Sequence, residues 1–164
     1  MRSLPSPTAA PTGGPSSTPA SPAVRRLGDW VSFAEARERL HGVRVLVLDP
    51  DTEAAGKIFV SLGQVGANVR IARRAVQVQP LLLELQPELV IVGTNLPDGD
   101  AVALCAALTA DTSDRRPQVV ALSARNTRSE RKRFVAAGCA GLVSKPIDVR
   151  LFAQELAREL GPRD

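Results

Sequence analysis

The chain has 164 residues, with 21 basic and 17 acidic side chains and a formal net charge of +4. No stretch approaches the roughly 20 apolar residues of a membrane-spanning helix, and two cysteines exclude a disulfide scaffold or a cysteine-rich metal site. The single histidine, His41, excludes a paired-histidine metal site. The first residues contain no apolar signal-peptide core, so we expect a cytoplasmic protein.

Residues 1–23 are dominated by Pro, Ser, Thr and Ala. Such a segment cannot bury enough apolar surface to offset the entropy of ordering, so we expect a disordered tail. Residues 1–26 contain three arginines and no acidic residue, and they therefore carry most of the net charge. The remainder is nearly neutral, which argues against a nucleic-acid-binding surface.

Residues 24–42 are expected to form an N-terminal helix and linker, with the helix at 30–41. Ser32 and Glu35 have the spacing of a capping box, in which each side chain bonds the backbone N–H of the other residue. Phe33 and Leu40 are seven positions apart and are predicted to share one face. The helix could pack on the main domain, or it could be a docking or dimerisation helix, and the sequence leaves both open.

Residues 43–162 alternate short apolar runs with amphipathic segments, and we interpret them as one domain. Apolar strands separated by helices predict an α/β fold, a doubly wound parallel sheet with helices on both faces. The predicted strands are residues 43–48, 69–72, 89–92, 119–122 and 141–144. The predicted helices are residues 53–65, 78–85, 100–110, 127–137 and 148–160. Ile58, Phe59 and Leu62 are expected to share the inner face of the first of these helices.

Ligands of such sheets bind outside the carboxyl ends of the strands, so the residues at these ends are the candidate site. The first strand is followed by Asp49, Pro50 and Asp51. The other strand ends supply Gly93 and Asn95, then Ser123, and finally Lys145.

Three features, in this order and spacing, resemble a known family. They are a strand ending in Asp49, a Leu-Pro-Asp-Gly sequence at 96–99 after an apolar strand, and a Ser-Ala strand end followed by Gly-Cys-Ala-Gly-Leu-Val-Ser-Lys-Pro-Ile at 138–147. Residues 43–160 resemble the CheY-like receiver domain of two-component response regulators. The resemblance implies a flavodoxin-like, five-stranded sheet of order 2-1-3-4-5, a signalling role and a cis peptide bond between Lys145 and Pro146.

Carried over by position, the family's phosphorylation site is incomplete in this chain. Asp49 matches the first acid of the metal-binding pair, but Pro50 occupies the place of the second acid and Asp51 comes one residue late. The phosphoacceptor aspartate, four residues before Pro97, is replaced by Gly93. The resemblance therefore implies an atypical receiver that lacks its acceptor.

The remaining family positions are occupied. Ser123 matches the hydroxyl that would bond a phosphoryl oxygen, Lys145 matches the lysine that would pair with it, and Leu142 occupies the aromatic switch position. Without an acceptor, Lys145 is expected to pair with Asp49.

No cofactor is expected at this site. Mg²⁺ prefers an octahedral shell of oxygen ligands, and the weak candidates here are Asp49, Asp51 and the carbonyl of Asn95. We therefore expect Mg²⁺ binding to be weak or absent. Asp98 and Asp100, in the loop before the next helix, are expected to cap that helix.

The predicted helix at 127–137 is strongly basic. Arg128, Arg131 and Lys132 are spaced to share one face, and Arg133 adds a further charge. In the family, this helix and the following strand, which contains Leu142, form the usual output and dimer surface. These five residues are our candidate partner-binding residues, with an acidic partner as the expected ligand and a merely solvated face as the alternative.

The sequence thus favours a single-domain, non-enzymatic signalling protein that acts by protein–protein interaction without phosphorylation. The expected partner is a regulatory protein such as a histidine kinase or another response regulator, with a homodimer as a further option and nucleic acid not expected. Two alternatives remain. One is modification at a displaced site, an aspartyl phosphate at Asp98 or Asp100 or a kinase target at Thr94. The other is a small-ligand-binding module with Asp49, Ser123 and Lys145 lining its pocket.

Overall fold

The computed structural model describes residues 30–110, 113–114 and 116–161, so the predicted tail at 1–23 lies outside the described residues. Its centre is a five-stranded sheet in which every strand pair is parallel and the order is β2-β1-β3-β4-β5. This confirms the predicted fold class and strand order. The strands are β1 (Arg44–Leu48), β2 (Asn68–Ala72), β3 (Leu89–Gly93), β4 (Gln118–Ser123) and β5 (Gly141–Ser144).

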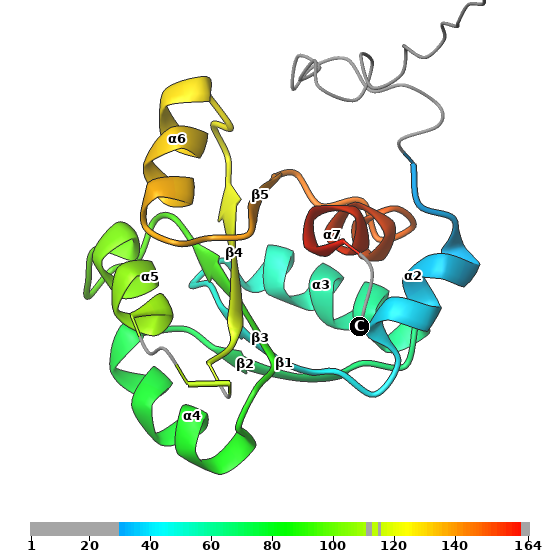
Figure 1. The fold of residues 1–164 in the computed structure, drawn as a ribbon, viewed down its shortest axis with the longest axis horizontal. Helices are drawn as coiled ribbons and strands as arrows, with labels where there is room; N and C mark the ends of the chain where they lie inside the picture. Colours follow the sequence, from blue (N-terminus) through cyan, green and yellow to red (C-terminus); the bar gives the residue numbers. More distant parts are fainter. Residues whose placement is uncertain (1–29, 111–112, 115, 162–164) are drawn as a thin grey trace, which may run out of the picture.

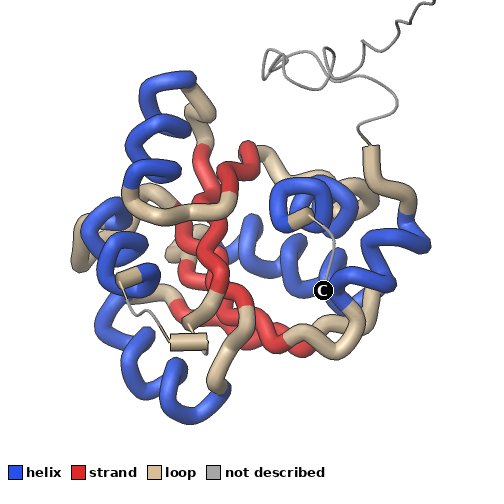
Figure 2. The backbone as a smooth tube through the Cα atoms, viewed as in Figure 1, coloured by secondary structure: helices blue, strands red, loops and turns tan. Residues whose placement is uncertain are grey.

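Helices cover both faces of this sheet (Figures 1 and 2). One layer consists of α2 (Phe33–Leu40), α3 (Thr52–Gln64) and α7 (Phe152–Leu160), and the other of α4 (Val78–Leu85), α5 (Ala101–Thr109) and α6 (Arg128–Ala136). A short 3₁₀ helix, η2 (Ala75–Gln77), precedes α4. No helix in the described part of the chain is long and apolar enough to cross a membrane.

The two-residue period of the strands divides the core between the two layers. Val45 and Val47 of β1 pack toward α2, α3 and α7, whereas Leu46 and Leu48 pack toward α4, α5 and α6. All five residues of β3 are buried. Strands with both faces covered need apolar side chains at nearly every position. The apolar runs in the sequence therefore predicted the positions of these buried strands correctly.

The N-terminal helix α2 has the predicted capping box. Glu35 N donates to Ser32 Oγ at 3.1 Å and Ser32 N donates to Glu35 Oε2 at 3.0 Å. The predicted shared face is wrong, however, because Leu40 is buried and Phe33 is 47% exposed. Val31, which precedes the cap, packs into the core at that end of the helix.

Helix α2 packs on α7. It is therefore an added helix of the main domain, which is the first of the two alternatives. Arg39 Nη1 donates to the carbonyl of Ala157 at 2.9 Å, and Gln154 Nε2 donates to the carbonyl of Val31 at 2.9 Å. The Arg158 guanidinium also lies 5.7 Å from the ring centre of Trp30, within the range of a cation–π interaction.

Two further predictions need correction. Phe59 is 51% exposed, whereas Ile58 and Leu62 are buried, because neighbouring helical residues are rotated by about 100° and Phe59 falls outside the buried stripe. The last helix begins at Phe152 rather than at 148. Asp148 instead forms a turn, in which its carboxylate accepts from Arg150 N at 2.9 Å, and this bond lowers the pKa of Asp148.

Candidate functional site

The carboxyl ends of β1, β3, β4 and β5 bring Asp49, Gly93, Ser123 and Lys145 to one edge of the sheet, as the sequence predicts. Lys145 N donates to the carbonyl of Ser123 at 2.8 Å, which joins the ends of β4 and β5. The Lys145–Pro146 peptide bond is cis, as the family resemblance implies.

An ion pair between Asp49 and Lys145 occupies the centre of this edge. Lys145 Nζ lies 2.9 Å from Asp49 Oδ2, and the Asp49 side chain is 2% exposed. Asp49 Oδ1 accepts from Asp51 N at 2.9 Å. A buried carboxylate requires a positive partner to remain charged, and Lys145 is that partner, as predicted.

Gly93 lies directly beneath this ion pair. A Cβ atom at Gly93 would lie 2.8 Å from both Cγ and Oδ2 of Asp49, closer than van der Waals contact permits. The Asp49 carboxylate therefore covers the position from which an acceptor side chain would start. Gly93 itself has no side chain, and the buried carboxylate of Asp49 fills the space above its backbone.

Asp51 serves as the N-cap of α3 rather than as a partner of Asp49 in a metal site. Its Oδ1 atom accepts from Glu53 N at 3.1 Å and from Ala54 N at 3.3 Å, and its Oδ2 atom lies 3.6 Å from Lys145 Nζ. The bond from Ala54 N and the nearby Lys145 charge hold the pKa of Asp51 below its usual value.

This donor set does not fit Mg²⁺. Asp49 is committed to Lys145, Asp51 to the helix cap, and Pro50 has no oxygen ligand in its side chain. Asn95 is exposed in the loop after β3. Among the described residues, no group of three or more His, Cys, Asp or Glu side chains gathers as a metal site.

The two acids of the β3–α5 loop have different roles. Asp100 caps α5 as predicted, accepting from Val102 N at 2.9 Å and from Ala103 N at 3.4 Å. Asp98 does not cap that helix. It accepts from Ala75 N at 2.8 Å and Val76 N at 3.2 Å, and these bonds, the first above all, lower its pKa. It thus ties this loop to η2, a contact between segments 22 or more residues apart that local spacing does not reveal.

The hydroxyl of Ser123 uses all of its hydrogen-bonding positions within the chain, which the sequence alone does not reveal. Ser123 is completely buried, and its Oγ atom accepts from Arg125 N at 3.0 Å and from Asn126 N at 3.2 Å. The same hydroxyl donates to the carboxylate of Glu130. The donor comes from a strand end and the acceptor from the following helix, so no short motif marks the pair.

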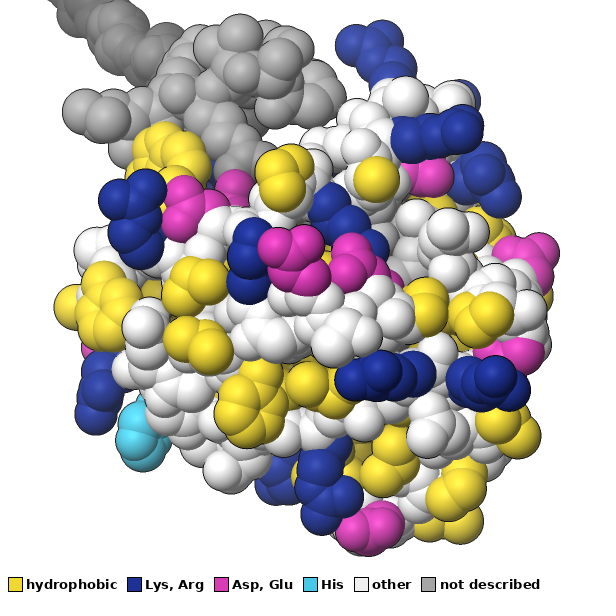
Figure 3. Space-filling model, turned by 180° about the vertical axis from the view of Figure 1, so that it is seen from behind, with side chains coloured by type: hydrophobic (Ala, Val, Ile, Leu, Met, Phe, Trp, Pro, Cys, Tyr) yellow, Lys and Arg dark blue, Asp and Glu magenta, His cyan; other side chains and the backbone are white. Residues whose placement is uncertain are grey.

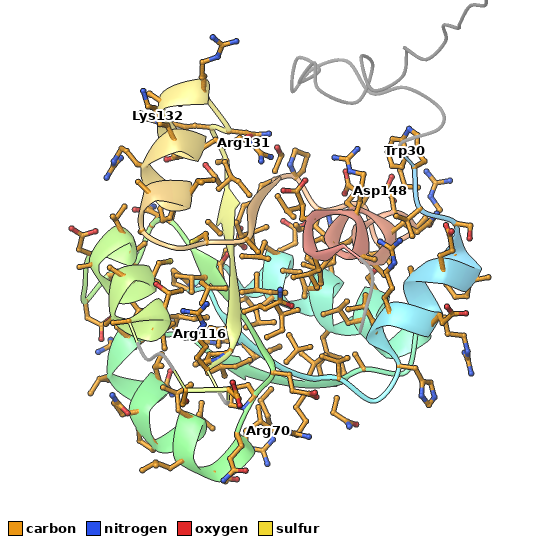
Figure 4. All side chains as sticks on the ribbon, viewed as in Figure 1. Trp30, Arg70, Arg116, Arg131, Lys132 and Asp148 are labelled. Atoms are coloured by element: carbon orange, nitrogen blue, oxygen red, sulfur yellow. The ribbon has the colours of Figure 1, made fainter. Side chains whose placement is uncertain are left out.

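Helix α6 exposes only part of the predicted partner-binding set. Arg128, Lys132 and Arg133 are exposed. Arg131 instead turns inward, where Nη2 donates to the carbonyl of Leu142 at 2.9 Å and Nη1 lies 3.4 Å from Glu159 Oε1. Figure 4 shows Arg131 and Lys132 on different sides of α6.

Two residues therefore leave the predicted contact surface. Arg131 is an internal link between α6, β5 and α7, because the carboxylate of Glu159 also accepts from Leu142 N at 3.2 Å. The Leu142 side chain is 1% exposed and packs in the core. The exposed charges that remain on and beside α6 are those of Arg125, Arg128, Lys132 and Arg133, and Lys and Arg side chains gather over this helix in Figure 3.

The small-ligand alternative requires a pocket that Asp49, Ser123 and Lys145 line together, and the cavity beside Lys145 is not such a pocket. The cavity beside Lys145 has a volume of about 260 Å³ and is lined by Asp51, Lys57 and Pro146, among others. Asp49 and Ser123 do not line it, because both are buried and engaged with other groups of the chain. The three side chains proposed to share a ligand thus do not converge on one open space.

The contact between Gly93 and Asp49 predicts an unusual cost for a very small substitution. Gly93→Ala should lower the free energy of unfolding by about 1–3 kcal/mol, because the new methyl group must displace a buried carboxylate. Gly56→Ala is the matched control: it lies in α3 with open space around it and should raise stability by about 0.5–1 kcal/mol. Urea unfolding measures both. A Gly93→Ala variant as stable as the parent would show that Asp49 does not fill this space.

Comparison with known proteins identifies the family of this chain. The family model for the response regulator receiver domain matches residues 45–157. The chain is similar to the dual master transcriptional regulator RpaA of Synechocystis sp., with 26% identity over 65% of this chain, and to the response regulator MprA of Mycobacterium sp. (strain KMS), with 31% identity over 63% of this chain. It spans 44% of the length of each of these two proteins.

A third relative is matched over most of its length. The polar-differentiation response regulator DivK of Brucella anthropi is 27% identical, and the match covers 68% of this chain and 91% of DivK. Among solved structures, the chemotaxis response regulator CheY4 of Vibrio cholerae superposes with a TM-score of 0.66 and 17% identity, covering 73% of this chain and 99% of CheY4. Because the family model matches more than half of the chain and the sheet order is the one expected, the chain belongs to the response regulator receiver domain family.

Proposed function

We propose that this chain is a receiver that signals through protein–protein contact without aspartyl phosphorylation. One observation carries the proposal: the Asp49–Lys145 ion pair covers Gly93, the position of the family's acceptor. The acid and the lysine that would hold a metal and a phosphoryl group neutralise each other instead. The receiver therefore keeps one conformation, and its activity depends on which partners are present.

The chemistry of phosphoryl transfer supports this proposal. Formation of an aspartyl phosphate requires a carboxylate nucleophile in line with the donor and a metal ion that neutralises the developing charge. Gly93 has no side chain, and the carboxylates nearest to it are occupied by Lys145 and by the cap of α3. The chain thus lacks the nucleophile and a free set of metal ligands.

The exposed charges of α6 support an acidic partner surface. Arg128, Lys132 and Arg133 lie on the helix, and Arg125 lies just before it. Such a cluster attracts acidic surfaces and accelerates encounter with them. A homodimer through this face would bring like charges together, so we propose a different protein as the partner, such as a histidine kinase or another response regulator.

Two broader parts of the proposal rest on the relatives. The match over 91% of the polar-differentiation response regulator DivK supports a signalling role for the receiver domain. A cytoplasmic location and a non-enzymatic role stay predictions, which the family membership favours.

The absence of phosphoryl transfer can be tested by intact mass. After incubation with acetyl phosphate and Mg²⁺, the purified protein should keep its original mass, because no nucleophile lies in the site. A receiver that retains its acceptor aspartate is the positive control. A phosphoryl adduct that hydroxylamine removes would contradict the proposal, and mapping would then distinguish Asp49, Asp51, Asp98 and Asp100.

The basic surface can be tested by charge reversal. The double variant Arg128→Glu/Lys132→Glu should bind a fluorescent polyglutamate peptide about tenfold or more weakly at low ionic strength. Its control is Arg37→Glu/Arg73→Glu, which reverses two exposed charges elsewhere and should change the affinity by less than about twofold. Fluorescence anisotropy measures both. Equal losses in the two variants would mean that net charge, and not α6, determines binding.

A further inference from the structure

Glu130 is the one acidic residue in the sequence of α6, among four basic residues. On a helix, its side chain could reach Arg133 at the i+3 position and neutralise part of the basic surface. The structure places it elsewhere. Its carboxylate accepts a hydrogen bond from the hydroxyl of Ser123, at the end of β4.

Ser123 is well suited to hold this carboxylate. A hydroxyl has one proton to donate and two lone pairs to accept with. Both acceptor positions are taken, by Arg125 N at 3.0 Å and Asn126 N at 3.2 Å, so the proton is committed to Glu130. Because Ser123 is completely buried at the end of a central strand, it is a fixed anchor rather than a mobile surface group.

The consequence is a basic surface without a nearby compensating acid. In the described part of the chain, Arg125, Arg128, Lys132 and Arg133 take part in none of the ion pairs. Arg131, whose side chain is 30% exposed, is bound by Glu159 and the carbonyl of Leu142. Glu130 is only partly exposed, so the exposed charges of α6 are the positive ones of Arg128, Lys132 and Arg133.

We propose that the Ser123–Glu130 hydrogen bond controls the affinity of the α6 surface for acidic partners. While Ser123 holds Glu130, the surface is uncompensated and binds an acidic segment. When Glu130 is released, it pairs with Arg133 on the helix surface and weakens that binding. The inference rests on the proposed function, and it identifies how the α6 contact surface is regulated. The regulating group is the carboxylate of Glu130, which accepts a hydrogen bond from the hydroxyl that would otherwise bond a phosphoryl oxygen.

A double-mutant cycle with the polyglutamate peptide tests this control. Ser123→Ala changes no surface side chain, yet it should weaken binding by about two- to fivefold, the range expected when an exposed ion pair forms. Glu130→Ala should bind at least as tightly as the parent. In Ser123→Ala/Glu130→Ala the loss should disappear, because no carboxylate remains to be released. Ser129→Ala, an exposed serine of α6, is the matched control and should bind like the parent.

Glu130→Asp provides a second route that leaves the buried serine intact. It keeps the charge but shortens the side chain by one methylene group, so the bond to Ser123 should lengthen and weaken, and binding should fall between that of the parent and that of Ser123→Ala. Thermal unfolding confirms that each variant is folded before its affinity is measured. If Ser123→Ala were unfolded, Glu130→Asp against Glu130→Ala would provide the same comparison.

The outcomes separate this inference from the proposed function. If Arg128→Glu/Lys132→Glu loses binding but Ser123→Ala and Glu130→Asp bind like the parent, the α6 surface stands and its control by Glu130 is wrong. If Ser123→Ala weakens binding and Glu130→Ala does not restore it, the loss comes from the β4–α6 loop, and the inference is again wrong. If Arg128→Glu/Lys132→Glu binds like the parent, the proposed surface itself fails.

Discussion

A negative charge that is buried at the end of β1 must be compensated, and this requirement organises the whole site. Asp49 is 2% exposed. Removing such a carboxylate from water costs several kcal/mol unless a positive group compensates for the lost hydration. In this chain that group is Lys145, at 2.9 Å. With Gly93 leaving room beneath the pair, no other cation is needed to stabilise the carboxylate.

The same principle extends to the rest of the strand-end groups. Ser123 uses its donor and both acceptor positions within the chain, and Arg131 and Glu159 satisfy each other between α6 and α7. The two groups that could have bound a phosphoryl ligand, the Ser123 hydroxyl and the Lys145 ammonium, are thus engaged with other groups of the chain. Exposed basic charge is clustered on and beside α6, at Arg125, Arg128, Lys132 and Arg133, where a partner can reach it. These contacts are the basis of our proposal that this receiver signals by its surface rather than by a switch in its pocket.

Much of the fold could be predicted because buried parallel strands need continuous apolar runs, and β1, β3 and β4 have them. The Asp49–Lys145 pair could also be predicted, since the topology places both strand ends at one edge. The roles of Asp98, Glu130 and Arg131 could not. Each depends on a contact between separate elements. Helical spacing alone assigned Arg131 to the outer face of α6, and its place in the loop alone assigned Asp98 to the cap of the following helix.

The most direct measurement is a double-mutant cycle on the ion pair, with urea unfolding of Lys145→Met, Asp49→Asn and the double variant. Lys145→Met should lower the free energy of unfolding by about 3 kcal/mol, because it leaves a buried carboxylate without its partner. The double variant should be less destabilised than the sum of the single variants, with a coupling of about 2 kcal/mol. Additive losses within about 0.5 kcal/mol would contradict the account, because they would mean that Asp49 and Lys145 do not depend on each other.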